Sequence, residues 1–373
     1  MKRIKSVMLI ILVIVLGTTL LLGACSSQTT TTTTSTTATT TQTSTTTSQV
    51  TSTTTQVVQV IELTFASSNS PTHPQSIADI AWMAKMEELT GGRVHFTPYW
   101  GGALMKSADA WDELVAGVAD VTEFSGAYVK EGFDLEKAQR ILFYGVANPD
   151  IARQVYDEVR VAYPEIDGEF SKAKVLARHV VSPYNLVTTT VAVRNLDDFK
   201  GLRLKVTGDF GKIAEKVGAL GQTIPMADTY VALEKNTIDG AFTPAETLKS
   251  FNFADYVRYI TMLNMAVGPT PHRAMNLDSW NKLPADIQQI FEDNIVWYGK
   301  EIENELYAAD DAGIALALEK GAVVIELSDA DLDQYYAYVH EVCLANMSVL
   351  DGKGLPGTAM YTLIRELIDQ YNP

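Results

Sequence analysis

The stretch LRLKVTGDFGKIAEKVGALGQTIPMADTYVALEKNTIDGAF, residues 202–242, decides the fold class. Short apolar runs alternate in it with segments that have helical spacing. It predicts strands and helices in turn, at Leu202–Val206, Phe210–Val217, Gln222–Met226, Asp228–Lys235 and Ile238–Phe242. Strands that alternate with helices form parallel sheets, so this stretch predicts an α/β unit.

A second unit of the same kind precedes it. Its expected strands and helices are Ile61–Phe65, Ser76–Thr90, Arg93–Tyr99, Asp109–Ala116 and Val118–Phe124. The two units also share local spacing, because the segments 111–120 and 230–239 place a helix end, a turn residue and a short strand in the same succession. Two α/β units in one chain predict two lobes, the first of them with a parallel sheet.

The last strand of each unit indicates where a ligand binds. In doubly wound sheets, ligands bind beyond the carboxyl ends of the strands. If the lobes face each other, the residues at and after these two strand ends share one site. These residues are Phe124, Ser125, Phe242, Thr243 and Glu246.

A long amphipathic segment runs from Pro284 to Lys320, with Gly321 as its expected C-cap. As one helix it would be about 55 Å long, which exceeds the width of one lobe, so we expect it to lie across both. Gly299 and Gly313 are the positions where it could bend. The alternative is two shorter helices.

The N-terminus has the pattern of an export signal. Lys2, Arg3 and Lys5 precede an apolar run that is too short for a spanning helix and stops at small residues before Cys25. Residues 22–25, Leu-Gly-Ala-Cys, resemble the bacterial lipobox, in which the cysteine becomes lipidated; an ordinary signal with a chance cysteine is the alternative. We expect residues 1–24 to be a signal peptide and residues 25–57, rich in Thr and Ser, to be a disordered tether.

Composition narrows the function further. The chain carries a formal charge of -16, and removal of the signal makes it three units more negative, so nucleic acid is not an expected partner. About 315 residues follow the tether, which suits two lobes. Apart from Cys25, the only cysteine is Cys343, which we expect to be a small core residue.

No motif for catalysis, phosphate binding or metal binding occurs in the sequence. We therefore expect no enzyme activity, cofactor or metal. Among the five histidines, His73 and His272 lie beside prolines in expected loops, where either can be a surface residue or line a cleft. Trp100 follows a strand and precedes two glycines, which suits either a packed turn or a ligand contact.

Three segments carry a family resemblance: residues 196–206 (LDDFKGLRLKV), residues 232–240 with Ala-Leu first and Ile-Asp-Gly last, and residues 275–284 (MNLDSWNKLP). With them, the chain from Ile61 onward resembles the substrate-binding protein of a TRAP transporter, of the dicarboxylate-binding type. The resemblance implies an α/β, two-lobed periplasmic-binding-protein-like fold with a long helix spanning both lobes. It also implies a small-molecule ligand held between the lobes and delivery to a sodium-coupled membrane permease.

The expected organisation follows from the elements and the resemblance together. We assign residues 58–182 to the first lobe, 183–270 to the second, 271–310 to the first lobe with the long bridging helix, and 311–373 to the second lobe with the C-terminal helices. The protein is expected outside the cytoplasm, held to a membrane by lipid at Cys25.

The binding residues that the resemblance implies depart from the family pattern. Lys205 stands where carboxylate-binding members commonly have an arginine, and Arg203 stands where they have a lysine. Strand alternation would put both on one face. Asn185 and Thr243 replace an arginine and an asparagine of some members, and Glu246 could favour a hydroxyl or an amine. The alternatives to TRAP-type binding are the binding protein of an ABC importer and a surface-anchored hydrolase.

Overall fold

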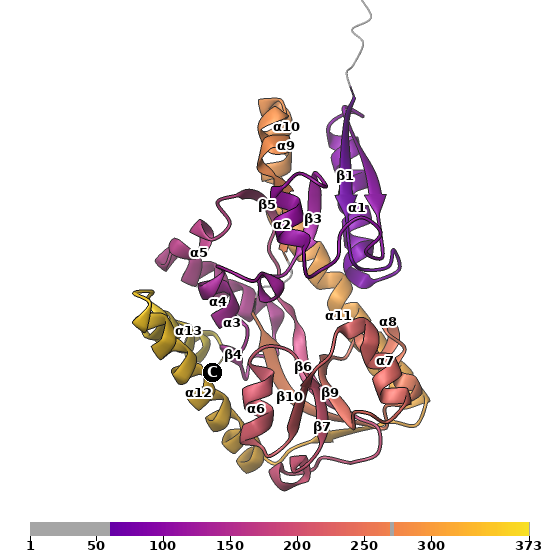
Figure 1. Ribbon diagram of the computed structural model, residues 1–373, viewed down its shortest axis with the longest axis vertical. Coiled ribbons are helices and arrows are strands. Elements are labelled where there is room, and N and C mark those ends of the chain that lie inside the picture. The colour runs from indigo at the N-terminus through magenta and orange to yellow at the C-terminus, as the bar shows by residue number, and fades with distance from the viewer. Residues whose placement is uncertain (1–59, 269–271, 373) are drawn as a thin grey trace, which may run out of the picture. The chain divides into compact units, whose positions relative to one another are not determined.

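The computed structural model describes residues 60–268 and 272–372. The expected signal peptide, Cys25 and the tether lie outside the described residues. The described chain contains two mixed sheets with helices packed against them (Figure 1). The two-lobed fold predicted from the sequence is confirmed.

The first sheet has five strands in the order β2-β1-β3-β11-β5. Their bounds are Val94–Tyr99 for β2, Ile61–Ala66 for β1, Val121–Phe124 for β3, His272–Asn276 for β11 and Ala173–Ala177 for β5. β1 pairs in parallel with β2 and β3, whereas β11 is antiparallel to both of its neighbours. The expectation of a parallel first sheet is therefore correct for every strand except β11.

The second sheet has seven strands in the order β12-β10-β6-β9-β7-β8, with β4 pairing to β10 outside this path. Their bounds are Val323–Glu326 for β12, Tyr259–Val267 for β10, Val181–Thr188 for β6, Gly240–Pro244 for β9, Arg203–Val206 for β7, Leu220–Thr223 for β8 and Phe143–Tyr144 for β4. β7 is parallel to β8 and β9, whereas β6 is antiparallel to both β9 and β10. The strands predicted from residues 202–242 all form, with ends that differ from the predicted ones by at most three residues.

Two of the segments that connect the sheets are short: the chain leaves β5 and enters β6 after three residues, and later leaves β10 and enters β11. The chain also enters the second sheet at β4, between β3 and β5 of the first sheet. The strand that follows each short crossing, β6 or β11, runs against the β-α-β strands of its sheet. This reversal follows if the carboxyl edges of the two sheets face each other. A chain that leaves one sheet at its carboxyl edge then enters the other sheet at the carboxyl edge of that sheet, and it must run in the opposite direction to the parallel strands there. The carboxyl ends of the parallel strands therefore face the space between the lobes.

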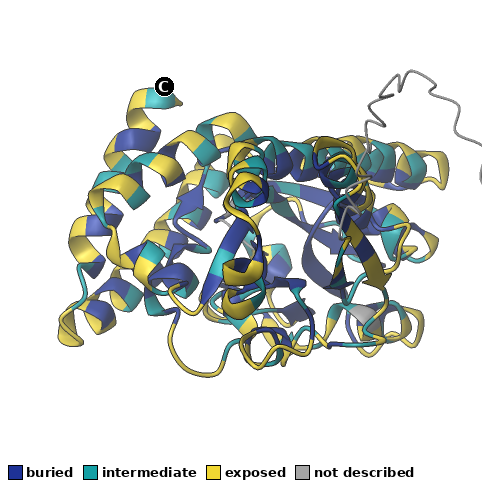
Figure 2. Ribbon diagram, turned by 90° about the horizontal axis from the view of Figure 1, so that it is seen from above, coloured by how far each residue is buried: buried dark blue, intermediate teal, exposed yellow. Residues whose placement is uncertain are grey.

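Helices cover both sheets, and Figure 2 shows the buried strands between helices whose outer faces are exposed. The first lobe packs α1 (Pro74–Leu89), α2 (Ala110–Val115), α9 (Leu277–Lys282) and α10 (Ala285–Asp293) against its sheet. The second sheet is covered on one side by α7 (Met226–Glu234), α8 (Thr247–Ser250) and η3 (Phe253–Asp255), and on the other by α3 (Asp134–Gln139), α4 (Pro149–Ala162), α6 (Phe210–Lys216), α12 (Asp329–Gly352) and α13 (Gly357–Tyr371). The remaining short helices are α5 (Glu165–Gly168), η1 (Gly126–Tyr128) and η2 (Leu196–Phe199).

Cys343 is fully buried in the core that α12 and α13 share with the second sheet, as expected. The lobe boundaries stay a prediction, and the sheets add one fact to them. Residues 143–144, inside the range assigned to the first lobe, form β4 and pair with β10 of the second sheet.

The long helix is α11, Ile295–Glu319, and it lies against both lobes. Near its start, Tyr298 stacks on Trp82 of α1 with ring centroids 4.6 Å apart, and near its end Ala317 packs in the core of the second lobe. The single helix predicted from Pro284 to Lys320 is wrong, and the alternative of two helices holds. The break is at Asn294, whose φ of -107° and ψ of 2° end α10.

Candidate functional site

A cavity of about 200 Å³ lies between the lobes. The first lobe lines it with Ser68 and Asn69 after β1 and with Glu123, Phe124 and Ser125 at the end of β3. The second lobe lines it with Lys205 of β7, Thr207 after it, and Pro244 and Glu246 at the end of β9. The crossing strand β6 and Leu306 of α11 complete the wall. The cavity lies where the carboxyl ends of both sets of strands converge, which is where the sequence predicts that a ligand binds.

Lys205 is only 1% exposed although it carries an ammonium group. Burial, with the positive charge of Arg140 beside it, lowers the pKa of Lys205 to about 8. In the described part of the chain, no carboxylate counters these two effects on the pKa. A buried cation without an anion of its own protein is an unfavourable arrangement, and an anion in the cavity relieves it.

Arg140 is the second cation of the cavity wall, and the sequence analysis missed it. It follows α3, and a Cβ placed on Gly208, in the loop after β7, would lie 3.9 Å from its Nη1. Arg140 reaches the cavity through long-range packing of α3 on the second lobe, and no local pattern in the sequence marks it.

Arg203 does not reach the cavity. Its Nε and Nη2 donate to the two carboxylate oxygens of Asp239 at 3.0 and 2.6 Å. This pair, together with the bond from the Arg203 amide to Asp239 Oδ2 at 2.8 Å, joins β7 to the turn before β9. The predicted pairing of Arg203 with Lys205 in one site is therefore not formed.

Asn185 also has a place in the framework rather than in the cavity wall. Its Oδ1 accepts hydrogen bonds from the amides of Leu263 and Asn264 at 2.8 and 3.1 Å. The pairing of β6 with β10 shifts register at this point, and Asn264 has a φ of 46°. The Asn185 side chain thus satisfies two amides that the irregular ladder leaves without a strand partner.

Phe242, Thr243 and Trp100 lie near the site without lining it. Phe242 packs in the core with its ring centroid 5.4 Å from that of Phe210, and Thr243 Oγ1 lies 3.0 Å from Thr247 Oγ1. Trp100 is half-buried against Phe65, with ring centroids 5.5 Å apart. Glu246, in the turn that follows β9, lines the cavity instead.

Glu246 is 5% exposed and lines the cavity. Burial raises its pKa to about 7. Its Oε2 accepts a hydrogen bond from Ser250, and its backbone amide donates to Asp310 of α11 at 2.6 Å. Within the described residues, its Oε1 has no hydrogen-bond partner.

His73 lines the cavity at the start of α1, where its Nδ1 accepts from the Gln75 amide at 3.3 Å. Its ring meets that of Phe251, from the second lobe, edge to face at 5.9 Å between centroids. Burial lowers the pKa of His73 to about 4, so it is neutral at physiological pH. His272 is instead buried outside the cavity, with its Nε2 2.5 Å from Glu136 Oε1.

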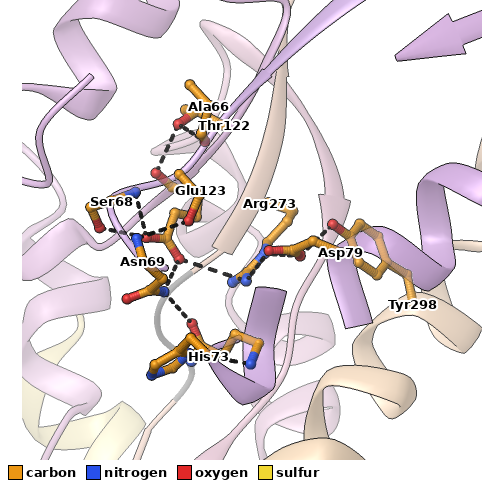
Figure 3. A network of polar contacts seen from close by, with 11 residues as sticks. Ala66, Ser68, Asn69, His73, Asp79, Thr122, Glu123, Arg273 and Tyr298 are labelled. Atoms are coloured by element: carbon orange, nitrogen blue, oxygen red, sulfur yellow. Dashed lines mark hydrogen bonds and ion pairs between the residues drawn. The ribbon is translucent and has the colours of Figure 1, made fainter. Parts of the chain in front are cut away.

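A polar network stands behind the wall of the first lobe (Figure 3). Glu123 Oε1 accepts from Ser68 Oγ at 2.6 Å, and Glu123 Oε2 accepts from Asn69 Nδ2 at 2.9 Å. Arg273, fully buried on β11, lies 3.6 Å from Glu123 and donates twice to Asp79 of α1, at 2.8 and 2.9 Å. Tyr298 of α11 also donates to Asp79, at 2.7 Å, so the network joins the cavity wall to the long helix.

Among residues 60–268 and 272–372, no cluster of three potential metal ligands occurs. In the same ranges no helix has the length and apolar character that a bilayer crossing needs.

Comparison with known proteins gives one family match. The model of bacterial extracellular solute-binding protein family 7 matches residues 65–347. A TRAP periplasmic solute-binding protein from Desulfovibrio salexigens is 29% identical, with a TM-score of 0.74 over 84% of this chain and 97% of that one. A TRAP solute-binding protein from Rhodoferax ferrireducens, solved with copurified benzoate, is 24% identical, with a TM-score of 0.75 over 83% and 98%. A monocarboxylate 2-oxoacid-binding periplasmic protein of Nostoc is 23% identical over 65% of this chain and 68% of its own length.

Proposed function

Because the chain belongs to bacterial extracellular solute-binding protein family 7, we propose that its cavity captures a small organic acid. The chain is a solute-binding protein of the TRAP type, and proteins of this kind bind their ligands without converting them. The ABC importer and the surface-anchored hydrolase, the two alternatives from the sequence, are not favoured by these matches.

The proposal of an organic-acid ligand rests on the pair of cationic side chains in the cavity wall. Lys205 and Arg140 both line the cavity, and among the described residues no carboxylate offsets the lowering of the Lys205 pKa by burial and by Arg140. A ligand carboxylate placed between them would form charge-assisted hydrogen bonds, one of them with the buried ammonium group of Lys205. The benzoate of the Rhodoferax protein and the 2-oxoacids of the Nostoc protein are acids of this kind.

Delivery and anchoring complete the proposal. The captured acid would pass to a TRAP-type membrane permease, as the family implies. Cys25, after residues 22–24 of the lipobox-like sequence, would carry lipid and hold the protein at a membrane through the tether. Cys25→Ser should release the protein from the membrane fraction, and an unmodified wild-type N-terminus in the soluble fraction would contradict the anchor.

Mass spectrometry of the small molecule that leaves the purified protein on denaturation tests the ligand class. We expect a compound with at least one carboxylate. A neutral or cationic compound, bound in one copy per protein, would contradict the proposal.

A further inference from the structure

The cavity wall has a second chemical character, opposite to that of its cations. Glu246 lines the cavity, its Oε2 accepts a hydrogen bond from Ser250, and in the described residues its Oε1 has no hydrogen-bond partner. The carboxylate is 5% exposed and its backbone amide is fixed by Asp310, so its position is set by the fold. It offers the ligand a hydrogen-bond acceptor.

The first lobe adds further acceptors because Glu123 engages its donors. Ser68 gives its hydroxyl proton to Glu123, and Asn69 gives an amide proton to Glu123 and shares its Nδ2 with Gln75 Oε1 at 3.4 Å. Ser68 Oγ and Asn69 Oδ1 can then act mainly as hydrogen-bond acceptors towards a ligand in the cavity, through their lone pairs. Glu123 itself is held by Arg273, which keeps this polarity fixed.

One donor remains on the same side. Gln75 lines the cavity, its Oε1 accepts from Asn69, and its Nε2 has no bond within the described residues. A ligand hydroxyl can donate to the acceptors and accept from this amide, whereas an ammonium group can only donate. Lys205 and Arg140 in the same wall also disfavour a second cation in the ligand.

We propose that the ligand is a hydroxylated organic acid, with its carboxylate at Lys205 and Arg140 and a hydroxyl group at Glu246, which selects for it. This inference rests on the proposed function and adds the second recognition element. Glu246 is then the residue that determines specificity, and Glu123 is a positioning residue that acts through Ser68 and Asn69.

Calorimetric titration with matched acids tests the hydroxyl. The probes are hexanoate, gluconate and 6-aminohexanoate, which share a six-carbon chain, and benzoate with 3-hydroxybenzoate. For each carbon skeleton, we expect the hydroxylated acid to bind at least about tenfold tighter than the plain acid, because an acid without a hydroxyl group leaves the buried acceptors unpaired. Equal affinity of hydroxylated and plain acids would overturn this inference and leave the organic acid standing. Failure of every acid to bind would overturn both, and tightest binding of 6-aminohexanoate would show that the acceptors recognise a cation.

The variant Glu246→Gln tests whether Glu246 is the residue that selects hydroxylated acids over plain acids. The amide keeps the shape but loses the charge, so affinity for the hydroxylated acids should fall about fivefold. Affinity for benzoate and hexanoate should stay equal or rise, because a negative charge near their carboxylate is removed, and this also shows that the variant is folded. Glu319→Gln, an exposed change at the end of α11, is the matched control and should change neither. An unaltered preference for hydroxylated acids in Glu246→Gln would overturn the role of Glu246.

Discussion

Lys205 is the residue on which recognition of an acid depends most. Lys205→Ala removes a charged donor from an enclosed site, which typically costs about 1.5 to 3 kcal/mol, or roughly tenfold to more than a hundredfold in affinity. Lys205→Arg should also weaken binding, because the guanidinium is longer, planar and placed beside Arg140. Titration with the tightest-binding acid of the panel checks both variants. Lys200→Ala, on the exposed surface, is the control, and wild-type affinity in Lys205→Ala would contradict the assignment.

The pH dependence of acid binding reports the same residue. In the empty cavity, burial and Arg140 lower the pKa of Lys205 to about 8, and a bound carboxylate favours the charged form and raises it again. Affinity for benzoate should therefore fall by up to about tenfold per pH unit above pH 8, until the pH reaches the higher pKa of the complex. The ionisation of Glu246, whose pKa is about 7, should add a separate decrease at lower pH, which Glu246→Gln should remove.

Proton uptake gives a direct reading of this shift. At pH 9, calorimetric titrations in buffers of different ionisation enthalpy should show the uptake of about one proton per benzoate bound. Glu246, with a pKa of about 7, is already ionised there and contributes little. Lys205→Met should abolish the uptake, and uptake that persists in this variant would assign the proton to another group.

At this scale the sequence predicted part of the site, and the reasons differ by residue. Lys205, Glu246, Phe124, Ser125 and His73 line the cavity, and the four of them other than His73 lie at or just after the ends of parallel strands. The strand topology predicted Phe124, Ser125 and Glu246 here, whereas Lys205 was predicted from the family resemblance. By contrast, Arg203 forms an ion pair with Asp239, and Asn185 accepts hydrogen bonds from two backbone amides in an irregular part of the sheet. The hydrophobic periodicity of the sequence does not indicate either interaction.

At the scale of elements, α11 shows how a helix can be fixed to two lobes. Gly299 and Gly313, the two positions where the sequence allowed a bend, lie inside an unbroken helix. A Cβ at Gly299 would come 2.1 Å from the carbonyl oxygen of Arg178, beside β5, and a Cβ at Gly313 would come 2.2 Å from that of Ala245, beside β9. The glycines therefore let the helix approach the backbone of each lobe closely. The break at Asn294, where Nδ2 donates to Ile290 O at 2.8 Å, was not predicted because asparagine is common on helix surfaces too.

Substitution of either glycine should loosen this attachment. Gly299→Ala and Gly313→Ala each force a methyl group against a carbonyl oxygen, and overpacking of this kind typically costs about 1 to 3 kcal/mol. Gly352→Ala is the matched control, because it lies in α12 with no atom within 4 Å of the added Cβ, and it should be neutral or stabilising. Urea unfolding of the three variants measures the difference. Equal free energies of unfolding for Gly313→Ala and Gly352→Ala would contradict the close approach.

At the scale of the folded domains, the lobes are joined by the short crossings from β5 to β6 and from β10 to β11, by the segments on either side of β4, and by α11. The crossing after β5 spans three residues, and α11, about 37 Å long, lies against both lobes. Local patterns predicted the two α/β units, but β4 and the reversed strands depend on which sheet each crossing enters. That choice is a property of the assembled chain, so it was not visible in the sequence.

Closure about these connections is the expected response to ligand. The cations lie on the second lobe and the acceptors around Glu123 on the first, so an acid that contacts both walls favours the state in which they are close. The His73 and Phe251 rings already meet across the lobes and should stay in contact. Small-angle scattering should give a smaller radius of gyration with saturating gluconate than without it. At a gluconate concentration that only just saturates the wild type, the compaction of Lys205→Ala should be smaller than that of the wild type, because its affinity for the acid is lower by roughly tenfold or more. A wild-type radius that is the same with and without gluconate, at a concentration shown by calorimetry to saturate the site, would mean that the lobes hold a fixed spacing and that binding occurs without closure.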